Sequence, residues 1–183
     1  MLNRNQEKKL VRRAQKDPQA FARLYNFYFP KIYRFITWRV GHNGDTEDLV
    51  SDIFFKALKN LSKFHFQKGA NFGSWLFRIA RNRLIDYYKA GEKRKLVNLE
   101  DIPEIISKEI LPQDRMERKE LFQKLQKLIQ TLPNVQKETL TLRFFAERRN
   151  KEIAEILGSS EKTVASNICR ALRNLHKKYK NLQ

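Results

Sequence analysis

Hydrophobic residues recur along this chain at helical rather than strand spacing. In the first half, apolar positions three and four apart occur through 10–14 and 21–35. Another amphipathic stretch follows Asp45, whose carboxylate can cap the free N–H groups at the start of a helix. A further helix is predicted at 72–89, after the break FHFQKGANFG. The sequence has neither useful strand-like alternation nor a fixed-period repeat, so the predicted fold class is all-α.

The apolar pattern weakens in the middle of the chain and then returns. The stretch at 96–114, LVNLEDIPEIISKEILPQD, contains two prolines and little periodicity, which indicates a linker. Beyond it, an apolar stripe at 121–132 ends at a proline, and another helix is expected at 134–146. The sequence therefore predicts two helical domains, 1–95 and 115–183, joined by this linker.

The distribution of charge follows the same division. Of the 183 residues, 38 are Lys or Arg and 20 are Asp or Glu, which gives a formal net charge of +18. Residues 1–95 carry a net +13 and residues 115–183 a net +9, whereas the linker at 96–114 carries a net −4. Two strongly basic domains predict a polyanionic partner, nucleic acid first and an anionic membrane surface second.

Composition also bears on redox state and cell compartment. The single cysteine, Cys169, excludes an intramolecular disulfide and a cysteine-based zinc site. The N-terminus has no apolar core of signal-peptide length, and no stretch approaches the ~20 apolar residues that a membrane span requires. We therefore expect a cytoplasmic protein, in which Cys169 is a half-buried structural thiol.

The residue pattern does not favour an enzyme. Asp48 and Asp52 lie four residues apart and could in principle act as acid and base, but no histidine accompanies them. His42, His65 and His176 are distant in sequence, and the chain has no Gly-rich phosphate loop or nucleophile motif. Paired carboxylates near a helix start usually interact with the helix dipole or form a binding face. We expect no catalysis, no metal, no cofactor and no small-molecule substrate.

The segment NKEIAEILGSSEKTVASNICRALRNLHK has the pattern of a helix-turn-helix. It divides into a short helix at 151–157, a turn at Gly158 and a longer helix from Glu161. Ser159 or Ser160 can cap the second helix. A helical hairpin that packs on another element remains the alternative. The expected buried side of the second helix is apolar and comprises Val164, Ile168, Leu172 and Leu175.

The opposite side of this second helix is the candidate base-reading face. In a DNA-binding helix-turn-helix, that face meets base edges in the major groove. The candidate residues are Lys162, Thr163, Ala165, Ser166, Asn167, Arg170 and Arg173. Three further cations, Arg148, Arg149 and Lys151, are expected to reach phosphates and to make binding dependent on salt.

A second candidate nucleic-acid site lies in the first half. On the helix at 72–89, a cationic stripe contains Arg78, Arg81 and Asn82. It adjoins a loop that mixes aromatic, basic and polar side chains, namely Phe64, His65, Phe66, Lys68 and Asn71. This combination suits unstacked bases beside a phosphate backbone. The alternative is that the phenylalanines belong to the core and that the stripe is a solvated face.

Three motifs in order resemble the bacterial RNA polymerase sigma factors. They are DTEDLVSDIFFKALKNLSKF, FGSWLFRIARNRLIDYYK and LPNVQKETLTLRFFAERRNKEIAEILGSSEKTVASNICRALRNL. The size and the two-domain plan are similar to the extracytoplasmic-function (ECF) group. The resemblance covers nearly the whole chain and is more specific than any one motif.

The resemblance implies a division of labour between the two domains. The first (region 2) would bind core RNA polymerase through Asp48, Leu49, Asp52 and Phe55. Its loop at 64–71 and the stripe above would capture the melted minus-ten promoter element, with one base flipped out. The second (region 4) would read the minus-thirty-five duplex, and the linker would thread into a polymerase channel. An anti-sigma protein is a further implied partner, one that could hold the chain at the inner face of the membrane.

Two other functions remain open from the residues alone. A stand-alone helix-turn-helix regulator would bind duplex operator DNA tightly without polymerase. An RNA-binding or membrane-surface protein would bind with little sequence preference. A sigma factor, by contrast, would bind duplex DNA weakly alone and direct promoter-specific transcription once core polymerase is added.

Overall fold

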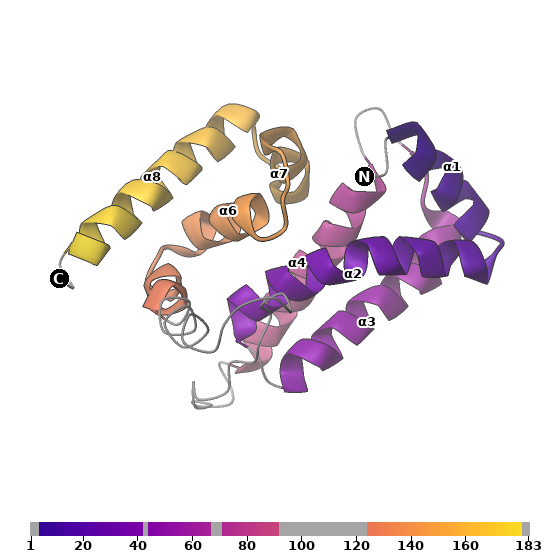
Figure 1. Cartoon of the computed structure of the whole chain (residues 1–183), viewed down its shortest axis with the longest axis horizontal. Coiled ribbons are helices and arrows are strands. Elements are labelled where there is room, and N and C mark those ends of the chain that lie inside the picture. Colours follow the sequence, from indigo (N-terminus) through magenta and orange to yellow (C-terminus); the bar gives the residue numbers. More distant parts are fainter. Residues whose placement is uncertain (1–3, 42–43, 67–70, 92–123, 181–183) are drawn as a thin grey trace, which may run out of the picture.

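The computed structural model describes residues 4–41, 44–66, 71–91 and 124–180, and every regular element among them is a helix (Figure 1). The all-α prediction is confirmed. The predicted linker at 96–114 lies outside the described residues, as does Lys68.

Four α-helices and one 3₁₀ turn form the N-terminal half. They are α1 (Arg4–Ala14), α2 (Pro18–Val40), α3 (Gly44–Asn60), η1 (Leu61–Lys63) and α4 (Phe72–Gly91). The start of α2 is fixed by Asp17, whose carboxylate accepts a hydrogen bond from the Gln19 N–H at 2.9 Å. Asn71 does the same for α4, since its side-chain oxygen accepts from the Ser74 N–H.

The expected cap at Asp45 is wrong in detail. Helix α3 begins one residue earlier, at Gly44, so Asp45 lies inside its first turn. There its carboxylate accepts a hydrogen bond from the hydroxyl of Tyr87 on α4 at 2.8 Å. Desolvation by burial, together with this carboxylate, raises the pKa of Tyr87 to about 12. Asp45 therefore connects α3 to α4 and still lies at the positive end of the helix dipole.

The C-terminal half contains a helical stretch at 124–130 and three longer helices. These are α6 (Asn134–Phe144), α7 (Asn150–Leu157) and α8 (Glu161–Lys180). The helix-turn-helix prediction is confirmed. Gly158 ends α7 in the left-handed conformation, with φ 65° and ψ 39°, and the hydroxyl of Ser160 accepts from the Thr163 N–H at 3.1 Å.

The buried side of α8 differs from the predicted one. Val164 and Ala171 are its buried residues, while Ile168 and Leu175 are half-buried. Leu172 is 46% exposed. Cys169, expected to be half-buried, is also exposed. Only a narrow stripe of α8 packs, because the helix lies across the outside of α6 and α7 (Figure 1).

The two halves pack against each other. Helix α4 contacts α7 and α2 contacts α6, and Figure 1 shows α6, α7 and α8 along one side of the N-terminal bundle. One buried cluster continues from Leu24 and Phe77 to Leu142 and Ile153. At a second junction, the rings of Trp38 and Phe145 stack with their centroids 3.7 Å apart. This contact between the halves is not predicted by the sequence pattern.

Candidate nucleic-acid interface

The outer face of α3 carries exposed acidic and aromatic side chains. Asp48 and Asp52 are exposed, and the Phe55 side chain is 66% exposed. Asp52 forms an ion pair with Arg83 of α4. Leu49, predicted with them, is instead only 4% exposed and packs in the core. Two carboxylates and an uncovered aromatic ring on one helix are typical of a protein-binding surface.

A pocket of about 280 Å³ opens between the end of α3 and the first turns of α4. Its lining combines basic, amide and aromatic groups: Lys56, Asn60, Lys63, Phe64, Trp75 and Ile79. This chemistry suits an unstacked base beside a phosphate. Of these residues, the sequence predicts a nucleic-acid role for Phe64 alone. Lysines recur every three to four residues near the end of α3, and this spacing could have identified Lys56 and Lys63 as candidate phosphate contacts.

The aromatic residues of the loop divide between core and surface. Phe64 is 7% exposed and packs against Phe66, Phe72 and Trp75, so it forms the pocket's floor rather than a free stacking partner. Phe66 is half-buried, and His65 is exposed. Phe64 is therefore a core residue, as the alternative interpretation of the loop phenylalanines predicts.

The polar residues of the predicted minus-ten site face the C-terminal half. Asn71 donates to a carboxylate oxygen of Glu152 at 3.0 Å. Arg78 donates to the main-chain oxygen of Glu155 at 2.8 Å, and Arg81 donates to Glu138 at 2.8 Å. Asn82 is exposed. The structure thus brings Asn71, Arg78 and Arg81 together at the start and along one side of α4, where each bonds to a residue of α6 or α7 and Arg78 stays exposed.

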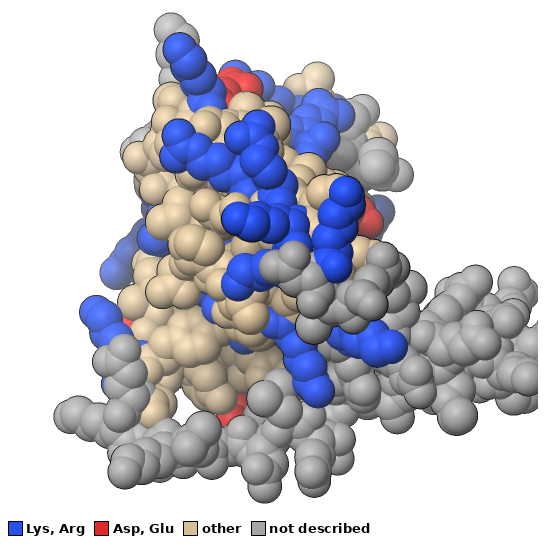
Figure 2. Space-filling model, turned by 90° about the vertical axis from the view of Figure 1, so that its left-hand side faces the viewer, with Lys and Arg blue, Asp and Glu red and all other residues tan. Residues whose placement is uncertain are grey.

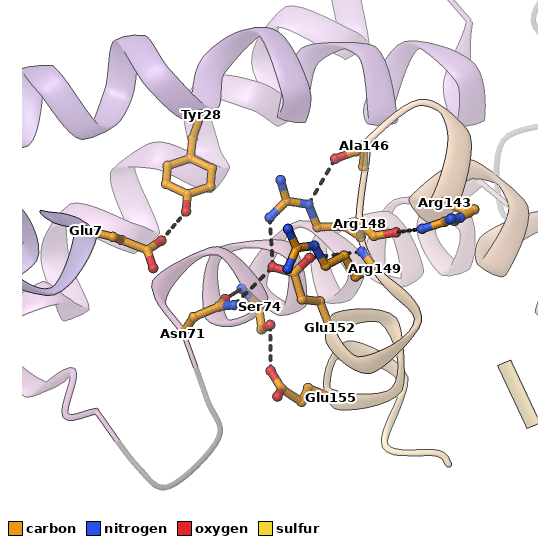
Figure 3. Close-up of polar contacts among 10 residues, drawn as sticks. All are labelled: Glu7, Tyr28, Asn71, Ser74, Arg143, Ala146, Arg148, Arg149, Glu152 and Glu155. Carbon is orange, nitrogen blue, oxygen red and sulfur yellow. Dashed lines mark hydrogen bonds and ion pairs between the residues drawn. The ribbon is translucent and has the colours of Figure 1, made fainter. Parts of the chain in front are cut away.

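Arg148, expected to contact phosphates, is buried at this junction. Its Nε donates to the Ala146 carbonyl at 2.9 Å, and its Nη1 donates to Glu152 at 3.3 Å (Figure 3). The guanidinium lies 5.1 Å from the centre of the Phe77 ring, a cation–π contact with α4. Gly73 leaves room for it, because a Cβ there would lie 2.9 Å from Nη1. The prediction of a phosphate contact for Arg148 is therefore wrong for this arrangement.

A second buried polar pair supports the same junction. The hydroxyl of Tyr28 donates to the carboxyl of Glu7, deep between α1, α2 and α4 (Figure 3). Burial raises the pKa of Glu7 above its usual value, an effect that the Tyr28 hydrogen bond and the nearby Arg148 charge oppose. Burial likewise raises the pKa of Tyr28. The charge of Arg148 thus acts on the buried Glu7–Tyr28 pair and lowers the pKa of both groups against the effect of burial.

The outer face of α8 is basic and accessible. Lys162, Thr163, Arg170 and Arg173 are exposed, whereas Ala165, Ser166 and Asn167 are half-buried. Figure 2 views the side of the molecule on which α8 lies, and Lys and Arg gather there with few Asp or Glu. Exposed Arg149, at the N-cap of α7, and exposed Lys151, in its first turn, add to this charge. A basic helix exposed on the second half of a helix-turn-helix can enter a major groove.

Among residues 4–41, 44–66, 71–91 and 124–180, no three His, Cys, Asp or Glu side chains gather as metal ligands would. Within the same residues, no helix combines the length and the apolar character needed to cross a bilayer.

Comparison with known families matches both halves of the chain. Residues 24–94 match the Sigma-70 region 2 model and residues 122–175 a Sigma-70 region 4 model. The chain is 30% identical over 184 residues to ECF RNA polymerase sigma factor SigW of Bacillus subtilis, covering 96% of this chain and 97% of the relative. It is 35% identical over 167 residues to ECF RNA polymerase sigma factor BldN of Streptomyces coelicolor, covering 91% of this chain but 63% of that longer protein.

Solved structures agree at the level of the fold. CnrH, solved with the cytosolic domain of CnrY, has a TM-score of 0.72 at 22% identity and covers 96% of this chain and 97% of its own. RpoE of Bartonella quintana, solved with the anti-sigma factor NepR, has a TM-score of 0.67 at 24% identity and covers 87% of this chain and 96% of its own.

The fold and the two family matches define a two-region, all-helical protein of the Sigma-70 class. Within that class, the chain belongs to the ECF RNA polymerase sigma factors.

Proposed function

We propose that this chain is an alternative sigma factor that binds core RNA polymerase and directs it to promoters. The observation that carries the proposal is the separation of three surfaces on one chain. They are the exposed acidic and aromatic face of α3, the α3–α4 pocket with the α4 stripe, and the basic outer face of α8. Each has the chemistry of a different partner: protein, melted strand and duplex.

Polymerase binding is assigned to α3. Asp48, Asp52 and Phe55 lie on its exposed face, where an aromatic anchor and two carboxylates can meet a basic partner surface. Leu49 supports that face from the core. The chain acts by binding alone, so the carboxylates have no catalytic role.

Capture of the minus-ten element is assigned to the pocket and to the α4 stripe. We propose that one extruded base enters the pocket beside Trp75, while Lys56 and Lys63 hold neighbouring phosphates. Beyond the pocket, the strand would continue along the loop and the α4 stripe. There it would contact His65, Phe66, Lys68, Asn71, Arg78, Arg81 and Asn82.

Reading of the minus-thirty-five duplex is assigned to α8. Arg170 and Arg173 are exposed on its outer side and can donate to guanine edges or phosphates. Lys162 and Thr163 lie in its first turn, where the helix dipole favours phosphate. Ala165, Ser166 and Asn167 complete the face, and Arg149 and Lys151 flank it.

The remaining partners follow from this role. Polymerase and promoter DNA place the chain in the cytoplasm. Because CnrH and RpoE of Bartonella quintana are solved with a partner, and NepR is named as an anti-sigma factor, we propose an anti-sigma protein as a regulator here too. Such a protein could also hold the chain at the inner membrane face.

The test is run-off transcription with purified core polymerase on a library of genomic promoters. We expect discrete promoter-dependent transcripts that core polymerase alone does not make, and weak duplex binding by the isolated chain. Tight operator binding without polymerase, and no transcript above the core control, would favour the stand-alone regulator instead.

A further inference from the structure

The exposed surface of α1 carries charge of one sign. The helix contains five exposed cations, whereas its one acidic residue, Glu7, is buried. The exposed cations are Arg4, Lys8, Lys9, Arg12 and Arg13. Of these, Arg13 forms an ion pair with Asp17, with N and O 3.7 Å apart, and within the described residues the other four form none. Most of the positive charge of α1 is therefore not compensated by the protein itself.

Three of these cations form a row along one side of the helix, which we call the α1 row. Arg4, Lys8 and Arg12 are four residues apart, so each lies about 6 Å along the axis from the next. Like charges at this spacing repel each other and lower the stability of a helix. A polyanion removes that repulsion, because its successive charges can contact successive cations of the row.

The side of α1 that carries this row lies against the loop beside the α3–α4 pocket. Gln15, on the same side, donates from Nε2 to the main-chain oxygens of Leu61 at 3.0 Å and Phe64 at 2.8 Å. The Lys8 ammonium lies 5.8 Å from the centre of the Phe66 ring, and that ring packs edge-on against Phe64. Since Phe64 lines the pocket, one aromatic ring, Phe66, connects the pocket wall to the α1 row.

The remaining two cations of α1 lie on a different side of the helix. Lys9 and Arg13 each follow a residue of the row by one position, which turns them about 100° further around the axis. They are of the same two residue types as Lys8 and Arg12 and have the same spacing. The helix therefore contains an internal control for the row.

We infer that the α1 row is a further nucleic-acid site, which holds phosphates of the melted strand next to the base in the pocket. The inference rests on the proposed function of that pocket. In one direction the strand leaves the pocket along α4. In the other it crosses Phe66 and reaches Lys8, which has Arg4 and Arg12 on either side. Contacts of this kind position the strand and strengthen its binding but read no sequence.

The test compares two variants of the full chain that differ in which side of α1 loses charge. Lys8→Gln/Arg12→Gln removes two cations of the row, and Lys9→Gln/Arg13→Gln removes the same residue types from the other side. The first probe is a fluorescently labelled single-stranded oligonucleotide of mixed sequence, titrated at several salt concentrations. The second probe is a duplex of the same sequence. Circular dichroism checks that both variants retain their helices.

We expect the row variant to bind the single strand about tenfold more weakly at low salt than the unchanged chain does. The log–log salt slope of that binding should fall by about 1.4, which is about 0.7 for each of two lost phosphate contacts. The control variant should change strand affinity by no more than about twofold, since salt screens charges that make no direct contact. Duplex binding, assigned to α8, should change by no more than about twofold in both variants.

Several results would overturn the inference. Equal loss of strand affinity in the two variants would mean that the total charge of α1 matters, rather than the row. An equal loss for single strand and duplex, or no measurable strand binding by the unchanged chain, would contradict the site as well. If the row variant keeps its strand affinity but loses binding to phosphatidylserine vesicles, the row contacts a membrane surface instead of nucleic acid.

Transcription separates this inference from the proposed function. If the unchanged chain directs promoter-dependent transcription but both variants bind the strand equally well, the α1 row alone is wrong. If the row variant loses strand affinity as expected but no promoter-dependent transcript forms with core polymerase, the phosphate site stands and the sigma function falls.

Discussion

Replacing Phe77 with alanine is expected to lower the free energy of unfolding by about 3–5 kcal/mol, the usual cost of truncating a fully buried phenylalanine. The Phe77 side chain is 0% exposed and packs edge-on against Phe35, with ring centroids 5.6 Å apart. It also supports the guanidinium of Arg148 at 5.1 Å. The cavity would therefore weaken both the N-terminal bundle and its junction with α7.

Urea unfolding followed by circular dichroism measures this change. Phe144→Ala removes the same side chain from a position that is 51% exposed, and it should shift stability by no more than about 0.5 kcal/mol. If the two variants were equally stable, the packing of α4 described above would be wrong.

The second large effect concerns the pocket. Lys56→Ala/Lys63→Ala removes both pocket-lining cations without disturbing the core, since both side chains are exposed. We expect promoter opening by the holoenzyme to fall about tenfold or more, at roughly 1 kcal/mol for each lost phosphate contact. The salt dependence of strand binding should also decrease, by about 0.7 in log–log slope for each contact.

The control for the pocket is Lys16→Ala/Lys59→Ala, which removes the same charge from exposed positions outside the pocket lining. Permanganate reactivity of unpaired thymines reports promoter opening, and native gels report binding to core polymerase. Polymerase binding should be unchanged in both variants. An equal loss of opening in the control would mean that total charge, rather than the pocket, holds the strand.

The sequence predicted those parts of the molecule that depend on short-range signals. The turn at Gly158 and the cap at Ser160 are local, because a positive φ and a hydroxyl three residues from an N–H suffice to define them. The resemblance implied that Asp48, Leu49, Asp52 and Phe55 belong to a polymerase-binding helix, and all of them except the buried Leu49 are exposed on α3. The family resemblance then identified the class of protein, which the comparisons confirm.

The parts that the sequence did not predict depend on contacts between distant segments. Arginine is usually a surface residue, and the burial of Arg148 depends on Gly73 and Phe77 of the other half. Phe64 lies in a loop whose composition suggests stacking on bases, yet its ring packs against three other aromatic rings. Only a narrow stripe of α8 packs on the other helices. Ala171 lies in that stripe and is buried, whereas the neighbouring Leu172 lies outside it and is exposed. Such contacts join segments far apart in the sequence, so local residue patterns do not predict them.

The central claim is that the two halves of one chain contact two promoter elements, one as duplex and one as melted strand. The single exposed cysteine, Cys169 on α8, allows a photoreactive group to be attached beside Arg170. In a second protein, Asn82→Cys with Cys169→Ser places the same group on the exposed side of α4. Both are assembled with core polymerase on a promoter found by run-off transcription and are then irradiated.

We predict that the group on α8 cross-links to the minus-thirty-five duplex and that the group on α4 cross-links to the non-template strand of the minus-ten element, both only with polymerase present. Cross-linking of both groups to the same element, or equal cross-linking without polymerase, would contradict the account.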